Sequence, residues 1–360
     1  MDDRTIYLRH LPLAAYRPRS MLHVPEHQVD RARFPVVDAH NHLGTWLTKG
    51  WAVGDVPALL DAMDASNVAT IANMDGFFGQ TLERNLDRYD RAHDGRFITF
   101  CGLNWHETAE PGFGDRLARS VTESAAAGAK GLKVWKELGL HVSDDEMQPL
   151  MPNDPRLAPV WAACSAAGLP VLIHTADPMA FFEPLDETNE RLEELLQHPD
   201  WWFGDRERFR PFEHLIDSLE GLVATNPRTV FIGAHMGGAA EDLARVGRML
   251  DMYANFHVDI AARIAELGRQ PQGAKSLIER HPDRVLFGTD WFPPEPEAYS
   301  IHFRFLETED ESFPYSTEDI PAQGRWAISG LGLSEDVLRA VYADNARRLI
   351  PGLTGGAAVP

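Results

Sequence analysis

Residues 35–44 read PVVDAHNHLG, a short apolar run that ends in two histidines, and this pattern decides the fold. Consecutive Val residues favour a strand that is buried on both faces. The strand part of this stretch is 35–39. Seven further runs of this kind lie at residues 69–74, 97–103, 131–135, 170–173, 229–233, 256–260 and 285–288. The chain therefore contains eight candidate strands.

Longer stretches between these runs have the spacing of amphipathic helices. They cover residues 56–67, 114–128, 156–168, 213–226, 241–253 and 274–283. Gly128 and Gly168 stand where a helix C-cap is expected. Strands that alternate with helices predict parallel βα units, and eight units favour an α/β (β/α)8 TIM barrel over an open sheet. No GxGxxG turn follows the first strand, which argues against dinucleotide binding.

We expect a single barrel domain over residues 1–360, whose first 33 residues (1–33) form an N-terminal extension. Long connections follow the fifth strand (175–211) and the eighth (291–323), on the face where barrel enzymes bind substrates. They are expected to act as a lid or pocket wall. Alternatively, Trp201, Trp202 and Phe203 form a dimer contact. The tail 355–360 has low complexity.

Charge and cysteine content limit the classes of function. There are 34 Lys and Arg against 54 Asp and Glu, giving a net charge of −20, which argues against a nucleic-acid partner. Cys101 and Cys164 have no CxxC partners, which suits a reducing cytoplasm. No apolar run approaches the roughly 20 residues of a membrane span, and no secretory signal is recognisable. We expect a cytoplasmic protein, and the aromatic loops favour a homodimer or larger homo-oligomer.

Five polar residues stand at the ends of predicted strands. His40 and His42 end the first, His174 the fifth, His235 the sixth and Asp290 the eighth. The C-terminal ends of barrel strands converge on one axis, so these side chains are expected to meet there. Any one histidine is more often a core or loop residue. Five coincident positions favour a divalent-cation site suited to Zn, Mn or Fe.

The order of these residues resembles the amidohydrolase superfamily. The segments GAHMGG (233–238), FGTDW (287–291) and DNARRLI (344–350) resemble its amidohydrolase-2 branch. That branch includes aminocarboxymuconate-semialdehyde and resorcylate-type decarboxylases and several lactone hydrolases. The resemblance spans residues 35–349, and it is specific for the superfamily and not for a substrate.

The resemblance implies that His40, His42, His174 and Asp290 bind the catalytic metal. His235 would lie just outside these ligands and either polarise the group under attack or hold the metal-bound water. Asp290 would serve as general base. A cation lowers the pKa of water from 15.7 to about 7, so a carboxylate can complete the deprotonation.

Lys133 ends the fourth strand, where binuclear members of the superfamily carry a carbamylated lysine that bridges two metals. With that modification, His174 and His235 would bind a second ion. The alternative is a free ammonium that pairs with Asp290 or with a substrate carboxylate. We expect one ion, most readily Zn, with Mn, Fe or Co as alternatives.

Candidate substrate-binding residues carry a weaker signal. Arg263 follows the seventh strand and either binds an anionic group or pairs with Asp259 or Glu266. Asp177 either contacts substrate or caps a loop helix. Trp46 and Trp135 either line the pocket or belong to the packed core.

The leading expectation is a metal-dependent hydrolase that acts on an amide, lactone or related carbonyl of a small, possibly anionic substrate. The alternative is non-oxidative decarboxylation of an aromatic or unsaturated acid. Resorcylate-type decarboxylases often have Glu in place of the first histidine, and His40 departs from that pattern. A third reading is a non-catalytic metal-binding barrel.

Overall fold

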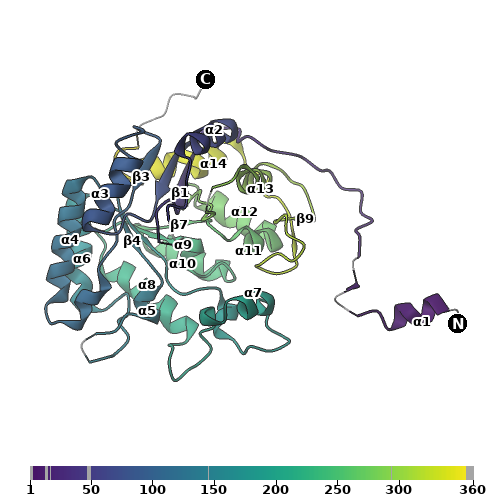
Figure 1. The fold of residues 1–360 in the computed structure, drawn as a ribbon, viewed down its shortest axis with the longest axis horizontal. Helices are drawn as coiled ribbons and strands as arrows, with labels where there is room; N and C mark the ends of the chain where they lie inside the picture. The colour runs from purple at the N-terminus through teal and green to yellow at the C-terminus, as the bar shows by residue number, and fades with distance from the viewer. Residues whose placement is uncertain are drawn as a thin grey trace.

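The chain folds into the predicted (β/α)8 barrel, with its helices wrapped around a ring of parallel strands (Figure 1). The computed structural model describes residues 3–12, 15–16, 18–46, 50–144, 146–292 and 294–353, so the low-complexity tail lies outside the described residues. None of the helices in these ranges combines the length and hydropathy that crossing a membrane requires.

The barrel strands follow one another around the ring in sequence order. They are β1 (Val36–Asn41), β2 (Val68–Asn73), β3 (Phe97–Thr99), β4 (Leu132–Val134), β5 (Val171–Ile173), β6 (Phe231–Gly233), β7 (Phe256–Asp259) and β8 (Val285–Leu286). A parallel bridge from Cys101 to Leu132 joins β3 to β4. The Ala39 N–H donates to the Phe287 carbonyl over 3.0 Å and closes the ring between β8 and β1.

The outer helices match the predicted amphipathic stretches and add α3 and the C-terminal group. They are α2 (Val56–Ser66), α3 (Gly79–Arg88), α4 (Phe113–Ala127), α6 (Ala158–Ala167), α8 (Phe212–Thr225), α10 (Leu243–Met252), α12 (Pro271–Arg280), α14 (Glu335–Arg339), the π-helical turn η6 (Ala340–Asp344) and α15 (Asn345–Leu349). Gly128 and Gly168 end α4 and α6 at positive φ, as predicted. Short helices occupy several connections: η2 (Trp105–Ala109), α5 (Glu137–Leu140), η3 (Pro155–Leu157), α9 (Ala234–Gly237) and α11 (Ile264–Arg269).

Two apolar clusters divide the core. The smaller consists mostly of strand residues, such as Val37, Ile98, Leu172 and Ile232, which indicates that it fills the barrel interior. The larger packs the outer strand faces against the helices. In β4, Leu132 and Val134 belong to the outer cluster, so the buried Lys133 between them points into the barrel.

Both long connections contain regular structure that the loop assignment did not predict. The first holds η4 (Met179–Phe182), α7 (Leu192–Gln197) and η5 (Pro199–Trp201). The second holds α13 (Pro296–Glu307) and the strand β9 (Phe313–Pro314), which pairs with β10 (Ala327–Ile328). Arg325 and Glu193 form an ion pair that ties β10 to α7. Phe203 is buried, and Trp201 and Trp202 pack against the same core, so these aromatic rings serve mainly the chain's own packing.

The N-terminal extension reaches away from the barrel and ends in the isolated helix α1 (Asp3–Arg9) (Figure 1). Tyr7, Met21 and Leu22 are exposed. Firm attachment begins later, where the His27 N–H donates to Asp310 over 2.7 Å and the Ala32 N–H donates to the Ser66 carbonyl over 3.1 Å.

Candidate metal centre

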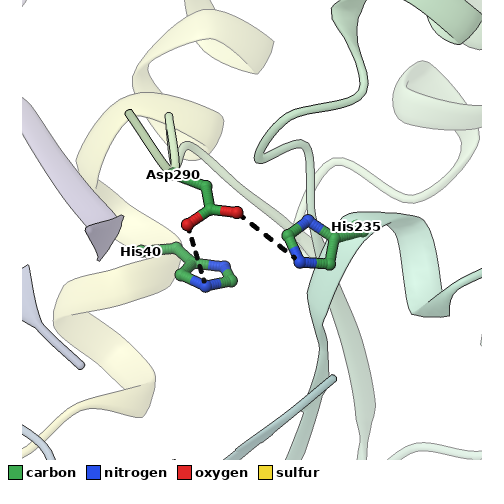
Figure 2. A group of neighbouring side chains, drawn as sticks. All are labelled: His40, His235 and Asp290. Carbon is green, nitrogen blue, oxygen red and sulfur yellow. Dashed lines mark ion pairs between the residues drawn. The ribbon is translucent and has the colours of Figure 1, made fainter. Parts of the chain in front are cut away.

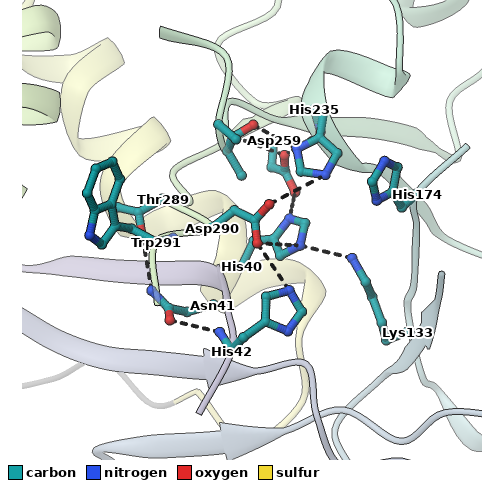
Figure 3. Close-up of polar contacts among 12 residues, drawn as sticks. His40, Asn41, His42, Lys133, His174, His235, Asp259, Thr289, Asp290 and Trp291 are labelled. Carbon is teal, nitrogen blue, oxygen red and sulfur yellow. Dashed lines mark hydrogen bonds and ion pairs between the residues drawn. The ribbon is translucent and has the colours of Figure 1, made fainter. Parts of the chain in front are cut away.

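Three of the predicted histidines meet around the carboxylate of Asp290 at the C-terminal end of the barrel (Figure 3). Nε2 of His42 lies 3.1 Å from Asp290 Oδ1. Nε2 of His40 lies 3.8 Å from the same oxygen, and Nε2 of His235 lies 3.8 Å from Oδ2. One donor atom each from His40, His235 and Asp290 lies within 4.8 Å of the other two (Figure 2). This spacing suits a shared cation.

Each of these imidazoles is oriented by a hydrogen bond at its other nitrogen. Nδ1 of His40 donates to Asp259 over 2.8 Å, and Nδ1 of His42 donates to Asp75 over 2.7 Å. Nδ1 of His235 donates to the Ala261 carbonyl over 2.8 Å. A neutral ring held in this way presents the lone pair of Nε2 to the centre, as metal-binding histidines do.

The backbone around the centre adopts left-handed conformations that residues with side chains rarely take. His235, Met236, Ala262 and Asp290 have φ of 58°, 59°, 51° and 53°. All four follow barrel strands. Such conformations cost of order 1 kcal/mol or more each and cluster at functional sites, so their position supports a site at this end of the barrel.

A buried carboxylate fixes the segment that carries Asp290. Asp38 accepts bonds from the Thr289 N–H (3.0 Å) and hydroxyl (2.7 Å), the Asn41 side chain (2.9 Å) and the Tyr299 hydroxyl (2.9 Å). These bonds join β1, the end of β8 and α13. A further bond, from the Asp290 N–H to the His40 carbonyl over 2.8 Å, holds Asp290 in register with the histidines of β1.

Burial and neighbouring charges shift the pKa values of the residues at the centre. Burial raises the pKa of Asp290, but the charges of His40, His42 and His235 outweigh burial and hold it well below its usual range. Burial lowers the pKa of His42, but Asp75 and Asp290 outweigh burial and raise it to about 9. His235 has a pKa well below its usual value, chiefly through burial.

Lys133 supplies a positive charge at the same place. Its Nζ lies 2.9 Å from Nε2 of His40, and burial lowers the pKa of Lys133 to about 8 despite the nearby carboxylates. The free ammonium therefore bonds to the ring nitrogen that the resemblance assigns to a metal. A bound cation would replace this contact, and an amine with a lowered pKa releases its proton more easily than an ordinary lysine.

His174 lies beside His235, with ring centres 4.3 Å apart. Its Nε2 is buried, lacks a hydrogen-bond partner among the described residues, and is 3.4 Å from Asp177 Oδ1. Burial lowers the pKa of His174 to about 4, so the ring is neutral and able to accept a cation. Asp177 itself is held by Lys136 at 2.6 Å, which favours a positioning role for it.

The remaining predicted residues lie at different distances from the centre. The ring of Trp135 is 4.7 Å from that of His42, whereas Trp46 is 54% exposed and 6.0 Å from Trp135. Arg263 donates to the Ala262 carbonyl, and among the described residues it makes neither of the ion pairs considered from the sequence. Glu266 instead pairs with Arg191, and Asp259 with His40.

Sequence reasoning missed Asp75 and the structural role of Asp259. Asp75 follows β2 and Asp259 ends β7. Both stand at strand ends, as the histidines do, and this shared position is the signal that could have identified them. Gly44 allows Asp75 to approach, because a Cβ at Gly44 would lie 2.4 Å from the Asp75 Cβ.

The donor set fits a divalent cation. It combines imidazole Nε2 atoms, a carboxylate that is ionised, and the buried Nε2 of His174, which makes no hydrogen bond to a described residue. Imidazole and carboxylate together suit Zn, Mn, Fe and Co.

Two cavities flank the centre. One of about 300 Å³ is lined by Thr289, Asp290, Trp291 and His302. The other, of about 560 Å³, is lined by Trp135 and further aromatic residues. Volumes of this order accommodate small organic molecules.

Comparison with known proteins agrees with this arrangement. A family model described as amidohydrolase matches residues 37–352. No curated protein matches the chain significantly.

Solved structures share the fold at low sequence identity. A 2,6-dihydroxybenzoate decarboxylase from Rhizobium is 18% identical with a TM-score of 0.55, over 88% of this chain and 98% of that one. A Polaromonas dihydroxybenzoic acid decarboxylase with bound manganese and an inhibitor is 16% identical with a TM-score of 0.54, over 88% and 96%. A Burkholderia multivorans amidohydrolase with bound HEPES is 14% identical with a TM-score of 0.52, over 88% and 98%.

Proposed function

The chain belongs to the amidohydrolase family, whose members are metal-dependent hydrolases or decarboxylases, and from this we propose that it hydrolyses an amide, lactone or related carbonyl of a small molecule. We assign one divalent cation, Zn in the first instance, to His40, His42, His174 and Asp290. Family membership argues against the reading as a non-catalytic barrel.

The observation that carries the proposal is the position of the Asp290 carboxylate. It lies 3.1–3.8 Å from three imidazole nitrogens and keeps its side chain 19% exposed, so solvent and substrate reach it. When bound, a divalent cation lowers the pKa of water and polarises a carbonyl. Asp290 is then placed to take the proton from the attacking water, since its low pKa keeps it ionised.

Of the two roles that the resemblance implies for His235, we assign the one that holds the attacking water. Its Nδ1–H is committed to the Ala261 carbonyl, so the neutral ring has a lone pair and no proton at Nε2. It therefore cannot donate to a substrate carbonyl in this state. It can accept a hydrogen bond from water and so orient the attack beside Asp290.

Hydrolysis is tested directly by the origin of the product oxygen. The purified, metal-loaded chain is incubated with a panel of aryl amides, lactones and esters in H2 18O, and the products are examined by mass spectrometry. We expect one 18O in the new carboxylate, and we expect Asp290→Asn to abolish turnover while circular dichroism remains unchanged. Turnover that releases CO2 from carboxylic acids, without hydrolysis of any panel member, would refute the proposal.

Decarboxylation is the second candidate, because two proteins of similar fold are named dihydroxybenzoate decarboxylases and an aromatic cavity borders the centre. Protonation of a ring carbon requires an acid. Resorcylate-type decarboxylases often have Glu where this chain has His40, and this difference places hydrolysis first.

A further inference from the structure

The larger cavity beside the metal centre has an aromatic wall. The rings of Trp46, Phe77 and Trp135 lie 5.2–6.1 Å from one another, and those of Phe77 and Trp135 are inclined by only 14°. Phe78 and Trp105 also line the cavity. Flat rings of this kind favour a planar ligand, because offset stacking adds to the area that the ligand buries.

Two buried polar atoms belong to residues that line the same cavity and lack hydrogen-bond partners among the described residues. They are Nε1 of Trp135 and Oε2 of Glu137. The indole nitrogen can only donate a hydrogen bond, and a carboxylate oxygen accepts one. Burying a polar group without a partner destabilises the protein, so a ligand that hydrogen-bonds to both atoms is favoured.

The aromatic cavity is adjacent to the reacting centre. Trp135 contacts His42 with ring centres 4.7 Å apart, and Nζ of Lys133 lies 5.3 Å from the centre of the Trp135 ring. A molecule whose ring rests against Trp135 therefore extends its substituents toward the candidate metal ligands.

We propose that this cavity binds the planar ring of the substrate and reads its polar substituents. The Trp135 N–H donates to a carbonyl or equivalent acceptor, and Glu137 accepts from an N–H or O–H donor. This inference rests on the proposed function and adds the substrate class: an aromatic or similarly flat compound that carries both an acceptor and a donor.

Three uncharged probes separate the contributions by isothermal titration calorimetry on the metal-loaded full chain. Benzamide has the ring, the carbonyl and the N–H donor. Acetophenone has the same shape without the donor, and cyclohexanecarboxamide has the amide without the flat ring. We expect benzamide to bind about tenfold more tightly than either, the size of one hydrogen bond or one lost stacking contact.

Variants assign each contact to its residue. Glu137→Ala should remove the difference between benzamide and acetophenone, and Trp135→Phe should weaken both by about tenfold because both carry the carbonyl. Trp202→Phe is the matched control, since its N–H donates to the Glu183 carbonyl and it does not line the cavity. It should leave all three affinities unchanged.

Equal binding of the three probes, or unchanged benzamide affinity in both Glu137→Ala and Trp135→Phe, overturns the inference. The outcome is separable from that of the proposed function. Hydrolysis of non-aromatic lactones without benzamide binding would refute the cavity assignment alone. Selective benzamide binding by a chain that hydrolyses nothing would refute the hydrolase proposal alone.

Discussion

At the scale of single residues, the hydrogen bond of His235 determines what its ring can do. With Nδ1–H donated to the Ala261 carbonyl, Nε2 faces Asp290 as an acceptor. We predict that His235→Asn retains about one metal ion per chain, because the four assigned ligands remain. Turnover should fall by about 100-fold or more, since the attacking water loses its orienting partner.

Asn is the informative substitution at this position because residue 235 has a φ of 58°, and Asn tolerates left-handed backbone better than Ala. Metal content by plasma emission spectrometry and turnover are measured on the same preparation. If metal and turnover disappear together while the fold persists, His235 is itself a ligand.

Asp75 acts through His42. Its carboxylate accepts from the imidazole Nδ1 and from the Gly44 N–H, so it fixes both the ring and the loop after β1. We predict that Asp75→Asn weakens metal affinity by 10- to 100-fold with the fold intact, as loss of an outer hydrogen-bond partner does elsewhere. Competition with a chelating dye measures the affinity.

A control for this prediction is Asp90→Asn, which alters another largely buried carboxylate that bonds to Thr99 and not to the centre. Its metal affinity should equal that of the wild type. An equal loss in both variants would attribute the effect to the loss of a buried carboxylate in general and not to the bond with His42.

The histidines and Asp290 could be predicted from sequence, whereas the pairing of each histidine with its outer partner could not. Polar residues at strand ends converge in any closed barrel, so His40, His42, His235 and Asp290 needed only the strand pattern. Which acceptor reaches each Nδ1 depends on the stagger between neighbouring strands. The resemblance likewise gave no sign that Lys133 would bond to His40.

At the scale of elements, the connection from α3 to β3 carries a group with a raised pKa. Burial raises the pKa of Asp90 to about 6, although bonds from the Thr99 N–H and hydroxyl oppose this. The folded pKa exceeds the ordinary value of 3.8, so the folded chain binds more protons than the unfolded chain between these pH values. The resulting stability is present at pH 4 and is lost as the pH rises through 6.

We therefore predict that Asp90→Asn is more stable than the wild type at pH 7.5, by about 2 kcal/mol. An amide imitates the protonated acid and can bond to both Thr99 groups. Urea unfolding from pH 5 to 7.5 should show the advantage shrinking as the pH falls. A difference between the two proteins that does not vary with pH would contradict the assignment.

Elements in the barrel ring were more predictable than elements in the long connections. The alternation of apolar runs and amphipathic stretches located all eight strands, although β3 and β8 are much shorter than their runs. Helix α13 was missed within a segment taken as a loop. Pro296 at its first turn was the available start signal.

At the scale of the whole molecule, the N-terminal extension lies apart from the barrel (Figure 1). The extension exposes apolar side chains and is anchored only from His27 onward among the residues described. We predict that removal of residues 1–22 changes Tm by no more than about 2 °C and leaves metal content unaltered. A loss of 5 °C or more would mean that the extension packs against a barrel, either its own or that of a second copy of the chain. Light scattering would distinguish these two cases.

Closure of the ring joins the two ends of the chain in a way that bears on biosynthesis. Asp38 and Thr289, which bond across the seam, are 251 positions apart, and the two histidines of β1 reach Asp290 only through the same seam. A nascent chain on the ribosome displays His40 and His42 long before Asp290 is translated. The full set of proposed ligands therefore exists only after residue 290 has been translated, and a chain that terminates before it would lack one proposed ligand.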